Sequence, residues 1–268
     1  MFFESASFFD THTHFDYLLA QQQQTVAQGV AEARNSNVEK ILIAAVLQSQ
    51  FEMLDSLCSQ APQNLCYGLG LHPLYIKQHQ PTDLDDLKVR LQNRPQLCKA
   101  MAEIGLERAV EELITTEMWQ KQCLFLESQL HLAQQFNLPV SLHSRRSHDQ
   151  LYTFLKRIPL AKTGVIHGFA GSYQQAKRFV DLGYSIGVGG TITYERANKT
   201  RQAIRQLPLN SLVLETDSPD MPIFGHQGQP NQPARIQQIF QTLCELRPES
   251  PEQIKHTIWQ NSTVLFGF

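Results

Sequence analysis

The sequence predicts an α/β fold, a single (β/α)₈ TIM barrel over residues 1–268. Three observations predict it. Short apolar runs alternate eight times with stretches of helical periodicity. Most of these runs are continuously apolar, as in residues 40–46, which is typical of parallel strands covered on both faces. The length of 268 residues also fits, because barrels of about 250 residues commonly form one domain.

The elements follow in order along the chain. Strands are predicted at residues 7–12, 40–46, 65–71, 97–103, 138–143, 163–167, 183–188 and 211–217. The clearest helices are predicted at residues 119–136, 172–182, 197–207, 232–246 and 251–266. Residues 219–233 contain four prolines and two glycines, which predicts a loop after the last strand. In a barrel this loop would form a wall of the substrate pocket.

Composition narrows the classes of function and the setting. The formal charge of −2 argues against a surface coated for nucleic acid, so a polyanion would need a local basic patch. No apolar stretch approaches the roughly 18 residues of a membrane span, and Phe2 and Phe3 belong to no recognisable secretory signal. Five cysteines without a CxxC pair predict free, buried thiols. We therefore expect a cytoplasmic monomer with no membrane contact and no obligate protein partner.

Residues that bind divalent metals stand at the predicted strand ends. His12 and His14 alternate, so they should point to the same side, and Asp10 shares their parity. Asp10 is expected to accept the outer N–H of a metal-bound imidazole. Other predicted strands end in Glu103, His143, His167 and Asp217. Because the carboxyl ends of barrel strands meet at one face, these side chains should converge there.

The set predicts a site for two metal ions. Nitrogen and oxygen ligands without thiolates suit Zn²⁺, Mn²⁺, Fe²⁺ or Mg²⁺, and histidines shift the preference away from Mg²⁺. Six ligands exceed what one tetrahedral ion with an open position uses. Two ions sharing one carboxylate account better for the set, and Glu103 is the natural bridge. Such a pair, about 3.5–4 Å apart, activates water and clamps a phosphoester.

Further residues are expected around the metals. His72 follows the third strand and is predicted to bind a substrate phosphate or to support a metal ligand, in preference to capping the next segment. Arg145 and Arg146 follow His143 directly and are predicted to hold substrate phosphates as well. Glu215 has the inward parity of Asp217 and should hydrogen-bond a metal ligand, since a buried carboxylate needs partners. His79 is expected at the surface.

Other chemistries compete less well, although two remain open. No Gly-x-Ser-x-Gly occurs and no cysteine ends a strand beside a histidine, which argues against nucleophilic catalysis. The same metals could instead hydrolyse a small lactone, cyclic amide or phosphoester. A non-catalytic binding protein on a retained barrel is a third possibility, disfavoured by the complete ligand set.

At this point the sequence resembles a known family, the TatD deoxyribonucleases, which are metal-dependent hydrolases of the amidohydrolase superfamily. The resemblance spans nearly the whole chain. It is carried by DTHTHFD (10–16), GLHP (70–73), AEIGLE (102–107), LPVSLHSR (138–145), VIHGFAGS (165–172), GYSIGVGGTIT (183–193), LETDSPDMP (214–222) and PNQP (230–233). Within the family the YjjV-like subgroup is most similar, through HSRRSHD, GGTITYERANKTR and GHQGQPNQP.

The resemblance implies a TIM barrel that holds two divalent ions, such as Mg²⁺, Mn²⁺ or Zn²⁺. The implied ligands of the first ion are His12, His14, Glu103 and Asp217. Those of the second are Glu103, His143 and His167. The implied reaction is hydrolysis of DNA from 3′ ends, with Asp217 and Glu103 as catalytic residues. Glu107 stands where the family commonly has Asp, which puts substrate positioning at that place in question.

Overall fold

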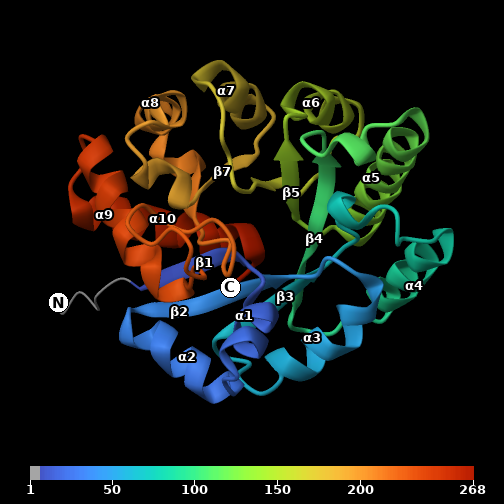
Figure 1. The fold of residues 1–268 in the computed structure, drawn as a ribbon, viewed down its shortest axis with the longest axis horizontal. Coiled ribbons are helices and arrows are strands. Elements are labelled where there is room, and N and C mark those ends of the chain that lie inside the picture. Colours follow the sequence, from blue (N-terminus) through green and yellow to red (C-terminus); the bar gives the residue numbers. More distant parts are fainter. Residues whose placement is uncertain (1–6) are drawn as a thin grey trace.

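Eight parallel strands in sequence order form one curled sheet in the computed structural model, which describes residues 7–268. The strands are β1 (Phe8–Thr13), β2 (Val38–Ala44), β3 (Leu65–Leu69), β4 (Cys98–Glu107), β5 (Val140–Arg145), β6 (Gly164–Ile166), β7 (Ser185–Val188) and β8 (Leu212–Leu214). The seam between β8 and β1 is joined where Thr11 Oγ1 donates to Leu214 O at 2.8 Å and Asp217 N donates to His12 O at 2.9 Å. The barrel is thus nearly closed, and the predicted (β/α)₈ fold class is confirmed (Figure 1).

Helices surround the strands on the outside of the barrel (Figure 1). They are α1 (Phe15–Gln22), α2 (Val26–Asn35), α3 (Phe51–Cys58), α4 (Pro81–Gln92), α5 (Thr116–Phe136), α6 (His148–Arg157), α7 (Tyr173–Asp181), α8 (Asn198–Gln206), α9 (Ile236–Leu246) and α10 (Pro251–Phe266). The five helices predicted from periodicity are all present. The fourth begins later than predicted, at Ile236, because a 3₁₀ turn at Pro233–Arg235 precedes it.

Apolar side chains fill two layers. One cluster lies inside the barrel, and the other lies between the strands and the outer helices. The inner cluster contains the small residues Ala44, Ala100 and Ala102 together with Phe9 and Phe266. The Phe9 and Phe266 ring centroids are 5.6 Å apart, so α10 packs against the start of β1. The barrel is therefore a packed core, and its opposite end is left for chemistry.

Several strand ends differ from prediction. β4 does not stop at Glu103 but runs to Glu107, because it stays paired with β5 through Gly105 and His143. β8 stops at Leu214, so Asp217 lies beyond the strand. His72 likewise lies beyond the end of β3. The sequence predicted these strand limits wrongly because pairing with a neighbour decides where a strand ends.

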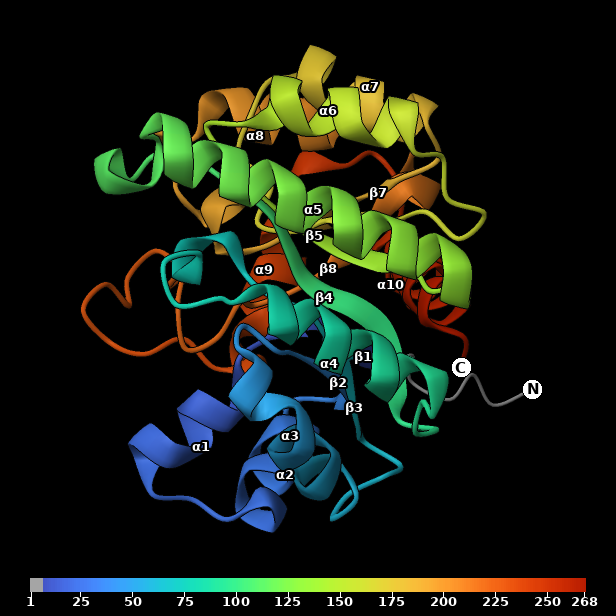
Figure 2. The same ribbon diagram turned by 90° about the vertical axis from the view of Figure 1, so that its right-hand side faces the viewer.

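The loop of residues 219–233 stands at the end of the barrel opposite the C terminus (Figure 2, orange, left). Cys58, Cys66 and Cys98 are buried free thiols, as expected, but Cys123 and Cys244 are only partly buried. Among residues 7–268, no helix has both the length and the apolarity that a bilayer crossing requires. The expectation about a secretory signal rests partly on Phe2 and Phe3, which lie outside the described residues.

Candidate metal centre

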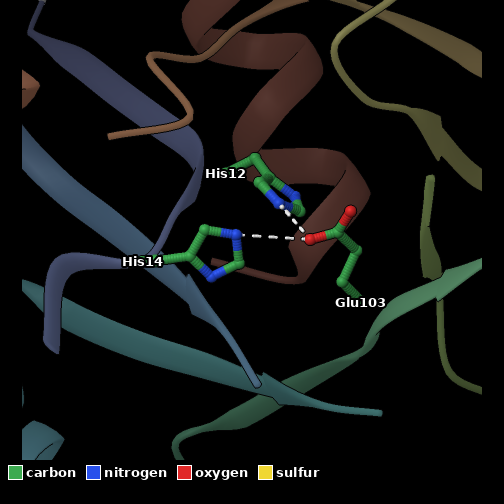
Figure 3. Close-up of side chains that lie close together, drawn as sticks. All are labelled: His12, His14 and Glu103. Atoms are coloured by element: carbon green, nitrogen blue, oxygen red, sulfur yellow. Dashed lines mark hydrogen bonds and ion pairs between the residues drawn. The ribbon is translucent and has the colours of Figure 1, made fainter. Parts of the chain in front are cut away.

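Glu103 lies at the centre of five imidazoles. Its Oε2 is 3.1 Å from His12 Nε2 and 3.4 Å from His14 Nε2 (Figure 3). Its Oε1 faces the other side of the cluster, 2.8 Å from His72 Nε2, 3.0 Å from His143 Nδ1 and 2.6 Å from His167 Nε2. The two oxygens of one buried carboxylate are therefore divided between two groups of imidazoles. Glu103 lies within β4, before the end of the strand, and this position places its carboxylate among the histidines.

Asp217 closes the cluster from the β8 side. Its Oδ1 is 3.7 Å from Nε2 of both His12 and His14. Its backbone has a φ of 57°, an uncommon left-handed conformation for a non-glycine residue, and its N–H donates to His12 O. The residues predicted as ligands are thus brought together. Three groups have possible ligand atoms within 4.8 Å of one another: His12, His14 and Glu103; His12, His167 and Asp217; and His72, Glu103 and His143.

The outer nitrogens of four of the five imidazoles are held by specific partners. Nδ1 of His12 lies 2.7 Å from Ser141 Oγ, and Nδ1 of His14 donates to Ala44 O at 3.1 Å. Nδ1 of His72 accepts from Leu74 N at 2.9 Å, so the proton of a neutral His72 is on Nε2, facing Glu103. His72 therefore donates a hydrogen bond to the proposed ligand Glu103, which is the second of the two roles predicted for it.

Glu107 holds His143, a contact that sequence reasoning missed. Its Oε2 accepts from His143 Nε2 at 3.0 Å, which leaves Nδ1 of His143 facing Glu103. Glu107 is buried, and its own backbone is bonded to Gln122 of α5. The AEIGLE motif carries the available signal, since β4 places Glu103 and Glu107 on one face by their even spacing.

Asp10 and Glu215 do not make the contacts predicted for them. Asp10 accepts from Thr216 N at 2.8 Å and from Thr216 Oγ1 at 2.6 Å, so it fixes the segment before Asp217 and no imidazole. Glu215 Oε1 accepts from Gly168 N, and its buried Oε2 has no hydrogen-bond partner. A Cβ at Gly187 would come within 2.3 Å of Glu215 Oε2, so only glycine leaves room for this side chain.

Burial and mutual charge set the protonation of the centre. Burial opposes ionisation of Glu103, but His167, His72 and His12 outweigh it and hold the pKa of Glu103 well below its usual range. Burial also opposes protonation of His14 and His167. Glu103 and Asp217 outweigh it, raising the pKa of His14 to about 9 and of His167 to about 10.

Two imidazoles stay neutral. Burial lowers the pKa of His12 to about 3, helped by the charge of His167, and lowers that of His72 to about 4. Burial raises the pKa of Asp217 to about 6. The carboxylates of this buried centre are thus stabilised by nearby positive charge. Protons on the imidazoles can supply that charge, and so can divalent cations.

The donor set fits divalent metal ions. It offers imidazole nitrogens and carboxylate oxygens with no thiolate, the combination that suits Zn²⁺ and Mn²⁺. The buried Nδ1 of His167 has no hydrogen-bond partner, which is unusual for a polar atom in a protein interior. The outer nitrogens of His14 and His143 are fixed by an acceptor, as is usual for metal-ligating imidazoles.

Arg145 and Arg146 are exposed beside this centre. Both line a hollow of about 260 Å³ that also contains His143, His167 and Asp217. A second hollow, of about 160 Å³, lies over Glu103 and is bordered by Tyr17 and Tyr75 among others. Both arginines therefore lie at the same face of the barrel as the metal residues, as predicted from the sequence. His79, expected at the surface, is buried and its Nε2 donates to His72 O at 2.9 Å.

The chain is similar to known proteins over nearly its whole length. The family model described as "TatD related DNase" matches residues 9–267. A Haemophilus influenzae protein named as an uncharacterized metal-dependent hydrolase is 61% identical, covering 97% of this chain and 99% of that one. The crystal structure of the TatD homologue YjjV from Escherichia coli K12 superposes with a TM-score of 0.92 at 44% identity, covering 98% and 99% of the two chains.

A more distant relative has a more specific name. The 3′-5′ ssDNA/RNA exonuclease TatD of Pantoea ananatis is 27% identical over 245 residues, which is 89% of this chain and 92% of that one. The match of the family model and the similarity to the Haemophilus influenzae protein each cover far more than half of the chain. The chain therefore belongs to the TatD-related DNase family.

Proposed function

We propose that this protein is a divalent-metal-dependent hydrolase of phosphodiesters and, within that class, an exonuclease acting on 3′ ends of nucleic acid. The observation that carries the proposal is the division of Glu103 between two groups of imidazoles. A carboxylate with one oxygen toward His12 and His14 and the other toward His143 and His167 is arranged to bridge two ions. Paired ions are typical of phosphodiester hydrolysis.

We assign the proposed ligands to two ion positions. His12, His14 and Asp217 would hold one ion with Glu103, and His143 and His167 would hold the other with Glu103. When bound, the ions would supply Lewis-acid stabilisation of phosphate charge and activation of water. Zn²⁺ and Mn²⁺ suit the four imidazoles better than Mg²⁺.

The chain's own groups would orient the reactants. The Asp217 carboxylate is the candidate acceptor of the proton lost by the attacking water, since this residue borders the hollow beside the cluster. His72 would present its Nε2–H toward the reacting phosphate or Glu103. Arg145 and Arg146 would bind phosphates of the strand and so position it without reading sequence.

The choice of nucleic acid within this class is supported by the family and by the name of the Pantoea ananatis relative. The exposed arginines next to the metal residues agree with it, because a small neutral lactone or cyclic amide gives them no role. We infer that nucleotides are released from 3′ ends because the same relative is named as a 3′-5′ exonuclease.

The test uses purified, metal-reconstituted protein with 5′-labelled single-stranded DNA and bis(4-nitrophenyl) phosphate. We expect shortening of the DNA from its 3′ end and hydrolysis of the ester. Asp217→Asn and Glu103→Gln should reduce both activities by at least about 10³-fold, since each removes a group acting on the reacting atoms. Equal activity in all three proteins would indicate a contaminating nuclease and contradict the proposal.

A closed circular single strand separates modes of attack. An exonuclease should leave the circle intact while the linear strand of equal sequence is degraded. Rapid cutting of the circle would show an endonuclease instead. Turnover of a lactone or hydantoin panel with neither phosphodiester hydrolysed would replace the proposed function by small-molecule hydrolysis.

A further inference from the structure

A hollow of about 280 Å³ lies next to the metal centre, between the segments that follow β7 and β8. It is lined by Thr191, Tyr194, Arg196, Ala197, Met221 and Pro222. Met221 also lines the hollow that contains His143, His167 and Asp217. Met221 therefore borders both hollows, and we refer to the two neighbouring hollows together as the path.

The two segments that form this hollow are fastened together. The Tyr194 hydroxyl donates to Pro222 O at 2.6 Å. Phe224 N donates to Thr193 Oγ1 at 2.8 Å, and Thr193 Oγ1 donates to Gly190 O at 2.6 Å. These bonds fix the backbone on which the surface side chains stand, so the hollow is preformed.

Large apolar groups are nevertheless exposed along it. The Phe224 side chain is 64% exposed and stands edge-on to Tyr194, with ring centroids 5.9 Å apart. Met221 is 41% exposed. Met221 borders the hollow of the metal residues, whereas Phe224 contacts Tyr194 at the neighbouring hollow. Exposed apolar groups that gather beside a hollow are typical of a binding surface.

Cationic groups accompany these rings. The guanidinium of Arg196 lies 4.9 Å from the Tyr194 ring centroid, and Arg145 and Arg146 border the same path nearer the metals. Two exposed acids, Glu195 and Asp220, are neighbours in sequence of the lining residues Arg196 and Met221. The exposed ring of Phe224 and the half-buried ring of Tyr194, both beside arginines, match a strand whose planar bases stack and whose phosphates are anionic.

We propose that this path is the binding site for the segment of single-stranded nucleic acid 5′ to the scissile bond. Bases stack on Phe224 and Tyr194, and phosphates lie near Arg146 and Arg196. The inference rests on the proposed function and extends it. It names the substrate as a polymer that the protein also binds at nucleotides 5′ to the cleaved bond. Stacking is tolerant of base identity, so no sequence preference is expected.

The first arm of the test measures kcat/KM on a single-stranded 12-mer and on bis(4-nitrophenyl) phosphate, which is too small to reach Phe224. Phe224→Ala should lower the ratio of the two values about tenfold, as expected for loss of one stacked base. Arg196→Ala should also lower the ratio about tenfold, because one phosphate contact is lost. Val264→Ala, an exposed apolar side chain on α10, is the control and should leave the ratio unchanged. An unchanged ratio in the first two variants would overturn the inference.

Phe224→Leu and Phe224→Trp separate stacking from simple apolar contact. Tryptophan should retain the wild-type ratio, whereas leucine should behave like alanine because it has no planar face. A leucine variant equal to wild type would overturn stacking. Melting temperatures of all variants check that the exposed substitutions leave the fold intact.

The second arm does not depend on turnover. Fluorescence anisotropy of the labelled 12-mer on Asp217→Asn protein should show a Kd that rises about tenfold on adding Phe224→Ala. If wild type hydrolyses neither phosphodiester but this rise is seen, the proposed reaction fails and the strand-binding path stands. No measurable binding, or a dimer that Phe224→Ala converts to monomer in sedimentation, would overturn the path.

Discussion

Glu107 controls the orientation of His143, and its removal is a test at the scale of one residue. Its carboxylate accepts from His143 Nε2 at 3.0 Å. Glu107→Gln keeps the size and reach of the side chain but removes the anionic acceptor. We expect affinity for the divalent ion to fall about 10–100-fold, as for other groups that orient metal-bound histidines. Isothermal titration of apo-protein with Mn²⁺ or Zn²⁺ measures it.

Glu117→Gln is the matched control, because this exposed acid on α5 undergoes the same chemical change away from the centre. It should bind metal as wild type does. If Glu107→Gln also bound metal with wild-type affinity, the Glu107–His143 contact would have no part in holding the ion.

The sequence predicted the residues around the metals better than it predicted the contacts that hold them. His12 and His14 share a strand and a parity, which a local pattern shows. Ser141, which holds His12, lies 129 positions away, and no local pattern connects the two. His79 was predicted wrongly at the surface from its loop context. It is buried because its Nε2 donates to His72 O, a contact that no local pattern shows.

At the scale of elements, α5 supports the centre with two buried glutamines. Gln122 pairs with the backbone of Glu107 at the end of β4. Gln129 accepts from Leu71 N at 2.7 Å and donates to Leu71 O at 3.2 Å, next to His72. The helix was predicted from its apolar positions, but its buried amides could not be, because glutamine is normally exposed.

Gln129→Leu tests this support. Leucine fills a similar volume but leaves Leu71 N and O without a partner, so we expect a loss of about 1–3 kcal/mol in the free energy of unfolding. Urea denaturation followed by circular dichroism measures it. Gln120→Leu, on the exposed face of the same helix, is the control. A loss below about 0.5 kcal/mol in Gln129→Leu would mean that water replaces the amide.

At the scale of the molecule, the fold class could be predicted because eight apolar runs alternate with helices, and only a few architectures accept that order. The contacts that close the barrel could not be predicted. It depends on the seam between β8 and β1, where Asp10 holds Thr216 and Asp217 N bonds to His12 O. Asp10 and Thr216 lie within two residues of the proposed metal ligands His12 and Asp217, so the contacts of the seam also position the metal centre.

Metal binding should therefore stabilise the whole barrel, since ions held by His12, Glu103 and Asp217 would join β1, β4 and the segment after β8. An ion at about 100 times its Kd adds about 2.7 kcal/mol. For a chain of this size that predicts a melting temperature roughly 5–10 °C above that of EDTA-treated protein. Differential scanning calorimetry with Mg²⁺, Mn²⁺ and Zn²⁺ measures the shift, and the ion that gives the largest shift at equal concentration binds most tightly.

Glu103→Gln should show a much smaller shift, because the shared carboxylate is gone. Equal melting temperatures of wild type with and without EDTA, after metal analysis confirms removal, would show that the ions do not join these strands.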